Sequence, residues 1–114
     1  MTMKKHTMIA AVALSLALVS TAWAGHGNAN DADAIKKAAD VCAACHGKDG
    51  ISVAPNFPKL AGQNEDYMQA ALKHYRSKQR SNAIMNGQAE KLTDKEIADL
   101  AAYYSQQKGL QVKR

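Results

Sequence analysis

Two cysteines and a histidine form the densest group of reactive side chains in the sequence. They stand in the run Cys42-Ala43-Ala44-Cys45-His46, and the chain has 2 Cys in all. Two thiols at this spacing can reach the two vinyl groups along one edge of a haem, and the next residue then lies under the iron, where a ring nitrogen can coordinate it. The spacing therefore predicts one covalent c-type haem attached through Cys42 and Cys45, with His46 as an iron ligand.

Three other sites use cysteines at a similar spacing. A Cys-x-x-Cys redox site would need a βαβ scaffold, and no segment here alternates with the period of a strand. A structural zinc site usually takes four ligands, and the sequence has no second cysteine pair. A short-loop disulfide leaves His46 without a role. Haem attachment is the reading that uses all three residues.

The N-terminal residues 1–24 have the pattern of an export signal. Lys4 and Lys5 precede an apolar run from Met8 to Val19, and Ala22-Trp23-Ala24 follows. A basic start, a short apolar middle and an A-x-A end are typical of a cleaved secretory signal. The run is well short of the roughly 20 residues that a membrane-spanning helix needs, although an uncleaved anchor is the alternative. We expect residues 25–114 to form one exported domain, located in the periplasm.

Composition limits what this domain can be. The chain of 114 residues has 1 Phe, 4 Tyr and a formal net charge of +5. So small a domain buries proportionally little surface and needs a cofactor, metal or disulfide to complete its core. The size excludes a multidomain enzyme and a polytopic membrane protein, and the cysteine count excludes a disulfide-dense scaffold. The charge is mild and no basic stripe alternates with aromatic residues, so nucleic acid is not an expected partner.

The spacing of apolar residues predicts three helices and two long loops. The first helix is capped by Asp31 or Asp33 and carries the cysteines. Residues 47–63, rich in Gly and Pro, form a loop. A second helix runs from near Asn64 to about Arg80, and a loop covers residues 81–92. The predicted buried faces, at helical spacing, are Ile35, Ala38, Ala39 and Cys42, then Met68, Ala71, Leu72 and Tyr75, and then Ile97, Leu100, Ala101 and Tyr104.

The third helix has the clearest boundaries. Thr93 and Glu96 form a capping box at its start, and Lys108 with Gly109 is expected to close it. The expected fold class is therefore all-α, with the helices and loops arranged around one haem.

Four motifs in the order of one family cover nearly all of residues 25–114. They run over 42–47 (CAACHG), 55–63 (PNFPKLAGQ), 80–85 (RSNAIM) and 100–104 (LAAYY). The chain resembles the class I cytochromes c, in particular one half of the bacterial dihaem cytochromes c and their short single-haem relatives. The resemblance implies iron held by a histidine and a distal methionine, and transfer of single electrons.

The second axial ligand can also be argued from the residues. Past the signal only Met68 and Met85 remain as methionines. Met68 lies on an apolar helical stripe, where a core methionine is the usual explanation. Met85 lies in the predicted second loop, before a turn-forming Asn86-Gly87, and its thioether would raise the potential of the iron. We therefore expect Met85 as the ligand; packing of Met85 against the core is the alternative. His74, which is predicted to be exposed, is a weaker candidate.

The resemblance implies further roles around the haem. The carbonyl of Pro58, or failing that of Pro55, would accept the second ring N–H of His46. Leu60 and Leu100 would pack against the haem, as they would in any core.

Polar and helix-packing roles also follow from the resemblance. Arg80 or Asn82 would bind a propionate or steady Met85, and Tyr103 would pack the first helix on the last. The chain departs from the family's better-known members at Ala34 and Ala38, where those have a glycine and an aromatic residue.

Lys73, Arg76 and Arg80 are predicted to share one helical face, which is either a solvated surface or a docking patch for a redox partner. The function implied by the resemblance is that of a soluble periplasmic one-electron carrier, which is not an enzyme and is expected to be a monomer. It would pass electrons from a membrane quinol-oxidising complex or a dehydrogenase to a terminal oxidase, reductase or peroxidase. The alternatives are a haem subunit of a periplasmic dehydrogenase and a gas-binding haem protein.

Overall fold

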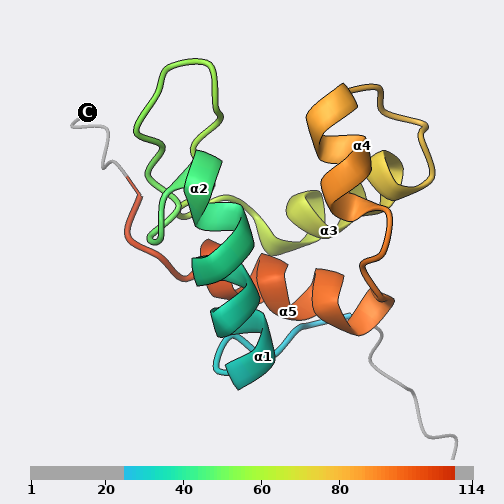
Figure 1. Cartoon of the computed structure of the whole chain (residues 1–114). Helices are drawn as coiled ribbons and strands as arrows, with labels where there is room; N and C mark the ends of the chain where they lie inside the picture. Colours follow the sequence, from blue (N-terminus) through green and yellow to red (C-terminus); the bar gives the residue numbers. More distant parts are fainter. Residues whose placement is uncertain (1–24, 110–114) are drawn as a thin grey trace, which may run out of the picture.

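The computed structural model describes residues 25–109, so the predicted export signal lies outside the described residues. Within this part of the chain every regular element is helical and no strand occurs (Figure 1), and no helix has the length and apolarity to cross a membrane. The elements are α1 (Ala32–Lys37), η1 (Ala38–Cys42), α2 (Ala43–His46), α3 (Glu65–Arg76), α4 (Ala83–Ala89) and α5 (Asp94–Ser105).

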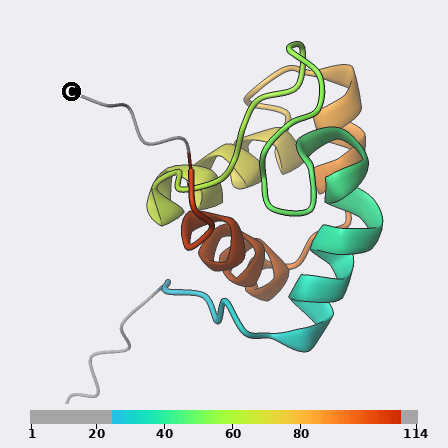
Figure 2. The same cartoon turned by 90° about the vertical axis from the view of Figure 1, so that its left-hand side faces the viewer.

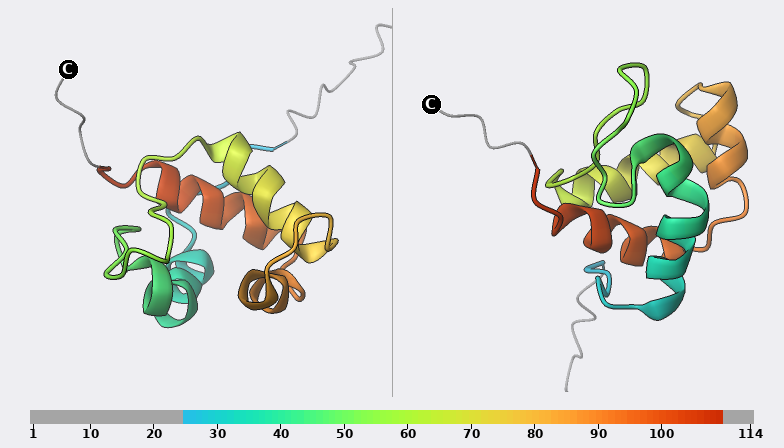
Figure 3. Two further views of the ribbon diagram at one scale, coloured as in Figure 1. Left: turned by 90° about the horizontal axis from the view of Figure 1, so that it is seen from above. Right: turned by 60° about the vertical axis from the view of Figure 1, so that its left-hand side comes forward.

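The helices pack around α5. Seen from above in Figure 3, α3 and α5 lie side by side, and α1 also contacts α5. α4 packs on α3. The buried residues of this core include Ala34 and Ala38 from the first helical segment, Met68 from α3, and Leu100 and Tyr104 from α5.

The first three elements form one helical column that contains a π-turn. Asp31 caps α1 by accepting a hydrogen bond from the Ala34 N–H at 2.9 Å. The Ala43 N–H then donates to the carbonyl of Ala38, five residues earlier, which is the π-helical pattern. The haem motif begins with the last residue of this wider turn, Cys42.

The predicted buried face of the first helix is wrong at one position. Ile35 is 37% exposed, whereas Ala34 and Ala38 are 3% and 0% exposed. The buried face therefore runs through Ala34 and Ala38, one helical turn apart, and continues to the half-buried Cys42. Alanine at 34 and 38 leaves this helix free to contact α5 closely, so the crossing forms without the family's glycine and aromatic residue.

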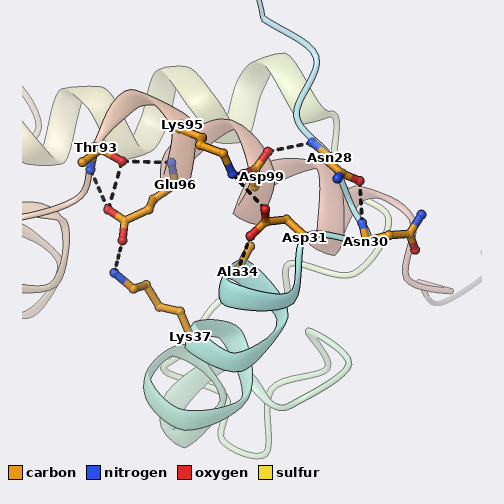
Figure 4. Close-up of polar contacts among 9 residues, drawn as sticks. All are labelled: Asn28, Asn30, Asp31, Ala34, Lys37, Thr93, Lys95, Glu96 and Asp99. Atoms are coloured by element: carbon orange, nitrogen blue, oxygen red, sulfur yellow. Dashed lines mark hydrogen bonds and ion pairs between the residues drawn. The ribbon is translucent and has the colours of Figure 1, made fainter.

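Polar contacts tie α1 and the segment before it to α5 (Figure 4). Lys37 pairs with Glu96, and Lys95 pairs with both Asp31 and Asp99. The carboxylate of Asp99, which is 4% exposed, also accepts the Asn28 N–H at 2.7 Å. These contacts surround the alanine crossing with charged and hydrogen-bonded groups.

The loop over residues 47–64 is irregular, as predicted, and arches away from the end of α2 in Figure 2. Its two limbs are joined at Gly50, whose carbonyl accepts the N–H groups of Leu60 and Ala61 at 2.8 and 3.1 Å. Gly50 has φ +73°, and a Cβ there would lie 2.7 Å from the Ala61 nitrogen, so a side chain does not fit. The Gly62 N–H donates to the carbonyl of Tyr104 at 3.0 Å and fixes the loop to α5.

The second predicted helix and the second predicted loop are both wrong in extent. α3 ends at Arg76, and Lys78 adopts a left-handed φ of +63°. The segment predicted as the loop 81–92 contains α4, which begins because the side chain of Asn82 accepts the N–H groups of Ile84 and Met85. The structure thus has a fourth helical segment where three were predicted.

Asn86 does not form the predicted turn either. It lies inside α4, and its side-chain amide donates to the carbonyls of Tyr75 and Arg80 at 2.7 and 2.8 Å. The last helix has the predicted capping box at Thr93 and Glu96 but ends at Ser105, before Lys108.

Candidate haem site

A cavity of about 490 Å³ opens between the first helical segment, the loop 47–64, and helices α3, α4 and α5. This volume lies within the range of ligand and cofactor sites. Cys42 and His46 line one part of it, and Met68 and Met85 also line it. Residues predicted as cofactor contacts at distant points of the sequence therefore meet around one cavity.

The two cysteines come from adjacent turns of the helical column. Both side chains are half-buried. Cys42 lines the cavity, while Cys45, on the turn that carries His46, is not among the lining residues. Burial raises the pKa of the Cys42 thiol, and the nearby Lys37 ammonium acts in the opposite direction.

The imidazole of His46 is held by a single backbone acceptor. Its Nδ1 atom lies 2.7 Å from the carbonyl oxygen of Pro58, and the residue is 8% exposed. A carbonyl only accepts hydrogen bonds, so Nδ1 carries the proton and Nε2 keeps its lone pair. No hydrogen bond to Nε2 occurs among the described residues. This tautomer is the one that a metal-binding histidine needs.

Two thioethers border the same cavity. Met68, on α3, is 6% exposed and belongs to the core cluster, whereas Met85, on α4, is half-buried. The prediction that Met85 lies in a loop is wrong, but its helix does turn it toward the cavity wall. His74 is exposed and is not among the lining residues.

The predicted apolar contacts line the cavity as well. Leu100 is 2% exposed on α5, and Leu60 is half-buried at the end of the loop. The predicted stripe of α3 is buried less than expected. Of its residues only Met68 is fully buried, because Ala71, Leu72 and Tyr75 face the cavity instead of a neighbouring helix.

Arg80 lines the cavity beside two tyrosines that the sequence did not single out as site residues. Its guanidinium lies 4.8 Å from the ring centroid of Tyr75 and donates to the hydroxyl of Tyr67 at 3.3 Å. Asn82 does not line the cavity; it caps α4 and so supports the helix that carries Met85. Spacing on α3 could have revealed Tyr67, which lies one helical turn before the predicted stripe residue Ala71.

Tyr103 packs against the core cluster that contains Ala34 and Ala38, and it also contacts the loop 47–64. Its hydroxyl donates to the carbonyl of Lys48 at 3.0 Å, and its ring meets that of Tyr104 edge-on at 5.0 Å. The neighbouring Tyr104 makes the contact between the last helix and the first, because its buried hydroxyl donates to the carbonyl of Ala38 at 3.4 Å.

The lining residues fit a haem. The walls are mainly apolar, with two thioethers and one imidazole ready to bind a metal. The charged lining residues are Lys37, Lys59, Arg80 and Lys91, and no Asp or Glu of residues 25–109 joins them. A haem carries two carboxylates, so a cationic lining offsets their charge.

The predicted basic face of Lys73, Arg76 and Arg80 is not a single helical face in the structure. Arg80 lies beyond the end of α3, so it does not share a helical face with Lys73 and Arg76. Arg76 is also engaged, since it donates to Asp94 at 2.6 Å and to the carbonyl of Leu92 at 2.8 Å.

The sequence matches the family model described as Cytochrome c over residues 32–108. The chain belongs to the cytochrome c family. Its Cys42–Cys45 pair is accordingly the attachment point of one covalent haem c. The cavity described above is the place in the fold that receives it.

Individual relatives agree with this assignment. Cytochrome c4 of Pseudomonas aeruginosa is 43% identical over 101 residues, which is 89% of this chain and 48% of the relative. Cytochrome c-554(548) of Halomonas halodenitrificans is 45% identical over 82 residues, which is 69% of this chain and 99% of the relative. The chain thus spans about half the length of its cytochrome c4 relative and nearly all of the shorter one.

Solved structures show the same fold. Reduced cytochrome c4 from Pseudomonas stutzeri superposes with a TM-score of 0.63 and 43% identity, covering 70% of this chain and 47% of that one. Cytochrome c4 of Acidithiobacillus ferrooxidans gives a TM-score of 0.64 at 31% identity, covering 73% and 52%. The predicted all-α class I cytochrome c fold is confirmed.

Proposed function

We propose that this chain is a periplasmic one-electron carrier whose iron is bound by His46 and Met85. The observation that carries the proposal is the imidazole of His46, with Nδ1 bound to Pro58 and Nε2 free, lining the same cavity as a thioether. With both His46 and Met85 holding the iron, no open position would remain for a substrate. The bound haem supplies a one-electron couple, Fe(II)/Fe(III).

The residues of this chain would bind the haem and exclude water from it. Leu60 and Leu100 add apolar surface to the cavity wall, and Lys59 and Arg80 bring positive charge near the haem carboxylates. A thioether ligand favours the reduced iron, and an apolar surrounding disfavours the extra charge of the oxidised state. Both effects support a potential suited to accepting electrons from a donor and passing them on.

Relatives support the kind of partner. A protein of Thiomonas intermedia named thiosulfate dehydrogenase electron acceptor is 40% identical over 68 residues of this chain. We propose that the donor here is a periplasmic dehydrogenase or a quinol-oxidising complex, and the acceptor a terminal oxidase, reductase or peroxidase. The export signal predicted over residues 1–24 supports a periplasmic location, and the carrier would act as a monomer.

Carbon monoxide distinguishes a carrier from a gas-binding haem protein or an enzyme with an open iron position. We expect the reduced holoprotein to bind carbon monoxide slowly at neutral pH and to exchange electrons rapidly with a redox partner in stopped-flow mixing. Rapid carbon monoxide binding by the native protein would contradict the proposal. A carrier should also elute as a free small protein, whereas a dehydrogenase subunit would elute with its enzyme.

A further inference from the structure

The cavity is lined by two thioethers, but a carrier of this kind needs only one. We infer that Met68 is a reserve iron ligand, which binds the iron when Met85 leaves it. The inference rests on the haem centre of the proposed function. It assigns to Met68 a role beyond packing, because Met68 and Met85 line one cavity together with His46.

The helix that carries Met85 is weakly attached. α4 has 7 residues, contains Gly87 in its interior, and packs on α3. Of its residues only Ala89 is buried. Besides its cap at Asn82, α4 is held by the side chain of Asn86, which donates to two carbonyls of the preceding chain and accepts the Asn82 N–H. Ile84, beside the ligand, is 54% exposed. Short segments with few buried contacts open locally long before the whole domain unfolds, so Met85 is the ligand most readily lost.

Met68 does not depend on α4. It lies near the start of the 12-residue helix α3, which packs on α5, and it is 6% exposed in the cluster with Leu100 and Tyr104. A methionine side chain is unbranched and can change rotamer without moving its helix. When α4 opens, Met68 therefore remains on the cavity wall with its sulfur available.

Other donors on the wall compete less well near neutral pH. Lys37, Lys59 and Lys91 line the cavity, but an ammonium must lose its proton before it can bind iron. Lys37 is moreover paired with Glu96. A thioether has no proton to lose in this range. The exchange of the iron ligand from Met85 to Met68 should therefore be insensitive to pH between mildly acid and neutral solution.

The test compares four holoproteins: wild type, Met68→Leu, Met85→Ala, and the double variant. The readout is the weak near-infrared band from sulfur to ferric iron, measured per haem. We expect the band in wild type and in Met68→Leu, because Met85 is then the ligand. We also expect it in Met85→Ala at reduced strength, and its complete loss in the double variant, which should bind carbon monoxide rapidly in the reduced state.

Two results would overturn the inference. One is absence of the band in Met85→Ala from mildly acid to neutral pH. The other is persistence of the band in the double variant. If instead Met68→Leu alone removes the band, Met68 is the resident ligand, and the ligand assignment of the proposed function fails together with the reserve role. Absence of the band from wild type would reject the proposed coordination itself.

A second pair of variants covers the case in which Met85→Ala does not fold. Asn86→Ala keeps Met85 and removes the three side-chain hydrogen bonds of Asn86, two to carbonyls of the preceding chain and one accepted from the Asn82 N–H. We expect carbon monoxide to bind several-fold faster to the double variant Asn86→Ala/Met68→Leu than to Asn86→Ala. Equal rates in the two proteins would mean that Met68 does not occupy the position when α4 opens.

Discussion

The Nδ1 atom of His46 lies 2.7 Å from the carbonyl oxygen of Pro58, twelve residues further along the chain. This contact joins the end of α2 to the far limb of the loop 47–64, so the loop orients the imidazole. A hydrogen bond from Nδ1–H makes the imidazole a more basic ligand. In the proposed carrier this favours the ferric iron and lowers the potential.

Loosening that loop should raise the potential. Pro58→Gly keeps the carbonyl but removes the ring that restricts the backbone. We expect an increase of up to about 59 mV, which corresponds to a tenfold change in a one-electron equilibrium, measured by potentiometric titration of the holoprotein. Pro55→Gly, in the same loop, is the matched control. A potential that changes equally in both variants would assign the effect to general loop flexibility.

The π-turn that leads into the haem motif and contains Cys42 should depend on Tyr104. Its buried hydroxyl donates to the carbonyl of Ala38, which also accepts the Ala43 N–H of that turn. We expect Tyr104→Phe to lower the free energy of unfolding by about 0.5–1 kcal/mol and to speed hydrogen exchange at the Ala43 amide more than at other helical amides. In the control Tyr103→Phe, which loses a bond to Lys48, Ala43 should exchange as in wild type. Unchanged protection of Ala43 in Tyr104→Phe would show that the hydroxyl does not hold the turn.

The buried carboxylate of Asp99, on α5, should contribute strongly to the free energy of unfolding. It is 4% exposed and accepts the Asn28 N–H at 2.7 Å while pairing with Lys95. We expect Asp99→Ala to lower the free energy of unfolding by about 1–3 kcal/mol, because it leaves the Asn28 N–H without its acceptor, whereas Lys95 keeps its pair with Asp31. Asp40→Ala removes an exposed carboxylate paired with Lys36 on α1 and should change stability little. Denaturant unfolding of both holoproteins checks this, and similar losses would contradict the burial argument.

Acid should destabilise the contact between α1 and α5. The Lys37 ammonium and the Thr93 backbone N–H hold the pKa of Glu96 below its ordinary value of 4.5. A carboxyl whose pKa is lowered by folding stabilises the protein above its unfolded pKa and loses that contribution as pH falls through the folded pKa. Wild type should therefore be more stable than Glu96→Gln at neutral pH, and the difference should shrink below about pH 4.5. Urea unfolding over a pH series measures it; a difference constant with pH would exclude this contribution.

Exposed cations near the end of α3 should speed docking of an acidic partner. Arg76 is bound to Asp94, so the freer cations are Lys73 and Lys78. Lys73→Glu with Lys78→Glu should slow electron delivery about tenfold at low salt and weaken its salt dependence. Lys36→Glu with Lys108→Glu makes the same change in net charge elsewhere. Equal slowing in both double variants would point to net charge alone, and no slowing would leave the face without a docking role.

Local sequence signals sufficed for the haem motif, the loop after it, and the caps at Asp31 and Thr93. The two caps depend on residues three positions apart, whose hydrogen bonds close within one turn, and the motif and the loop are marked by residue types within one short run. The same reasoning failed for α4, since 7 residues with an internal glycine show too little helical periodicity to outweigh the turn signal of Asn86-Gly87.

The residues themselves determined that this chain carries a covalent haem, because the attachment chemistry needs only Cys42, Cys45 and His46 in sequence. Only the tertiary structure decided what surrounds it. The hydroxyl of Tyr104 on Ala38, and Met68 and Met85 on one cavity, join residues that are far apart along the chain. Such contacts depend on how the helices cross, and no local pattern encodes that.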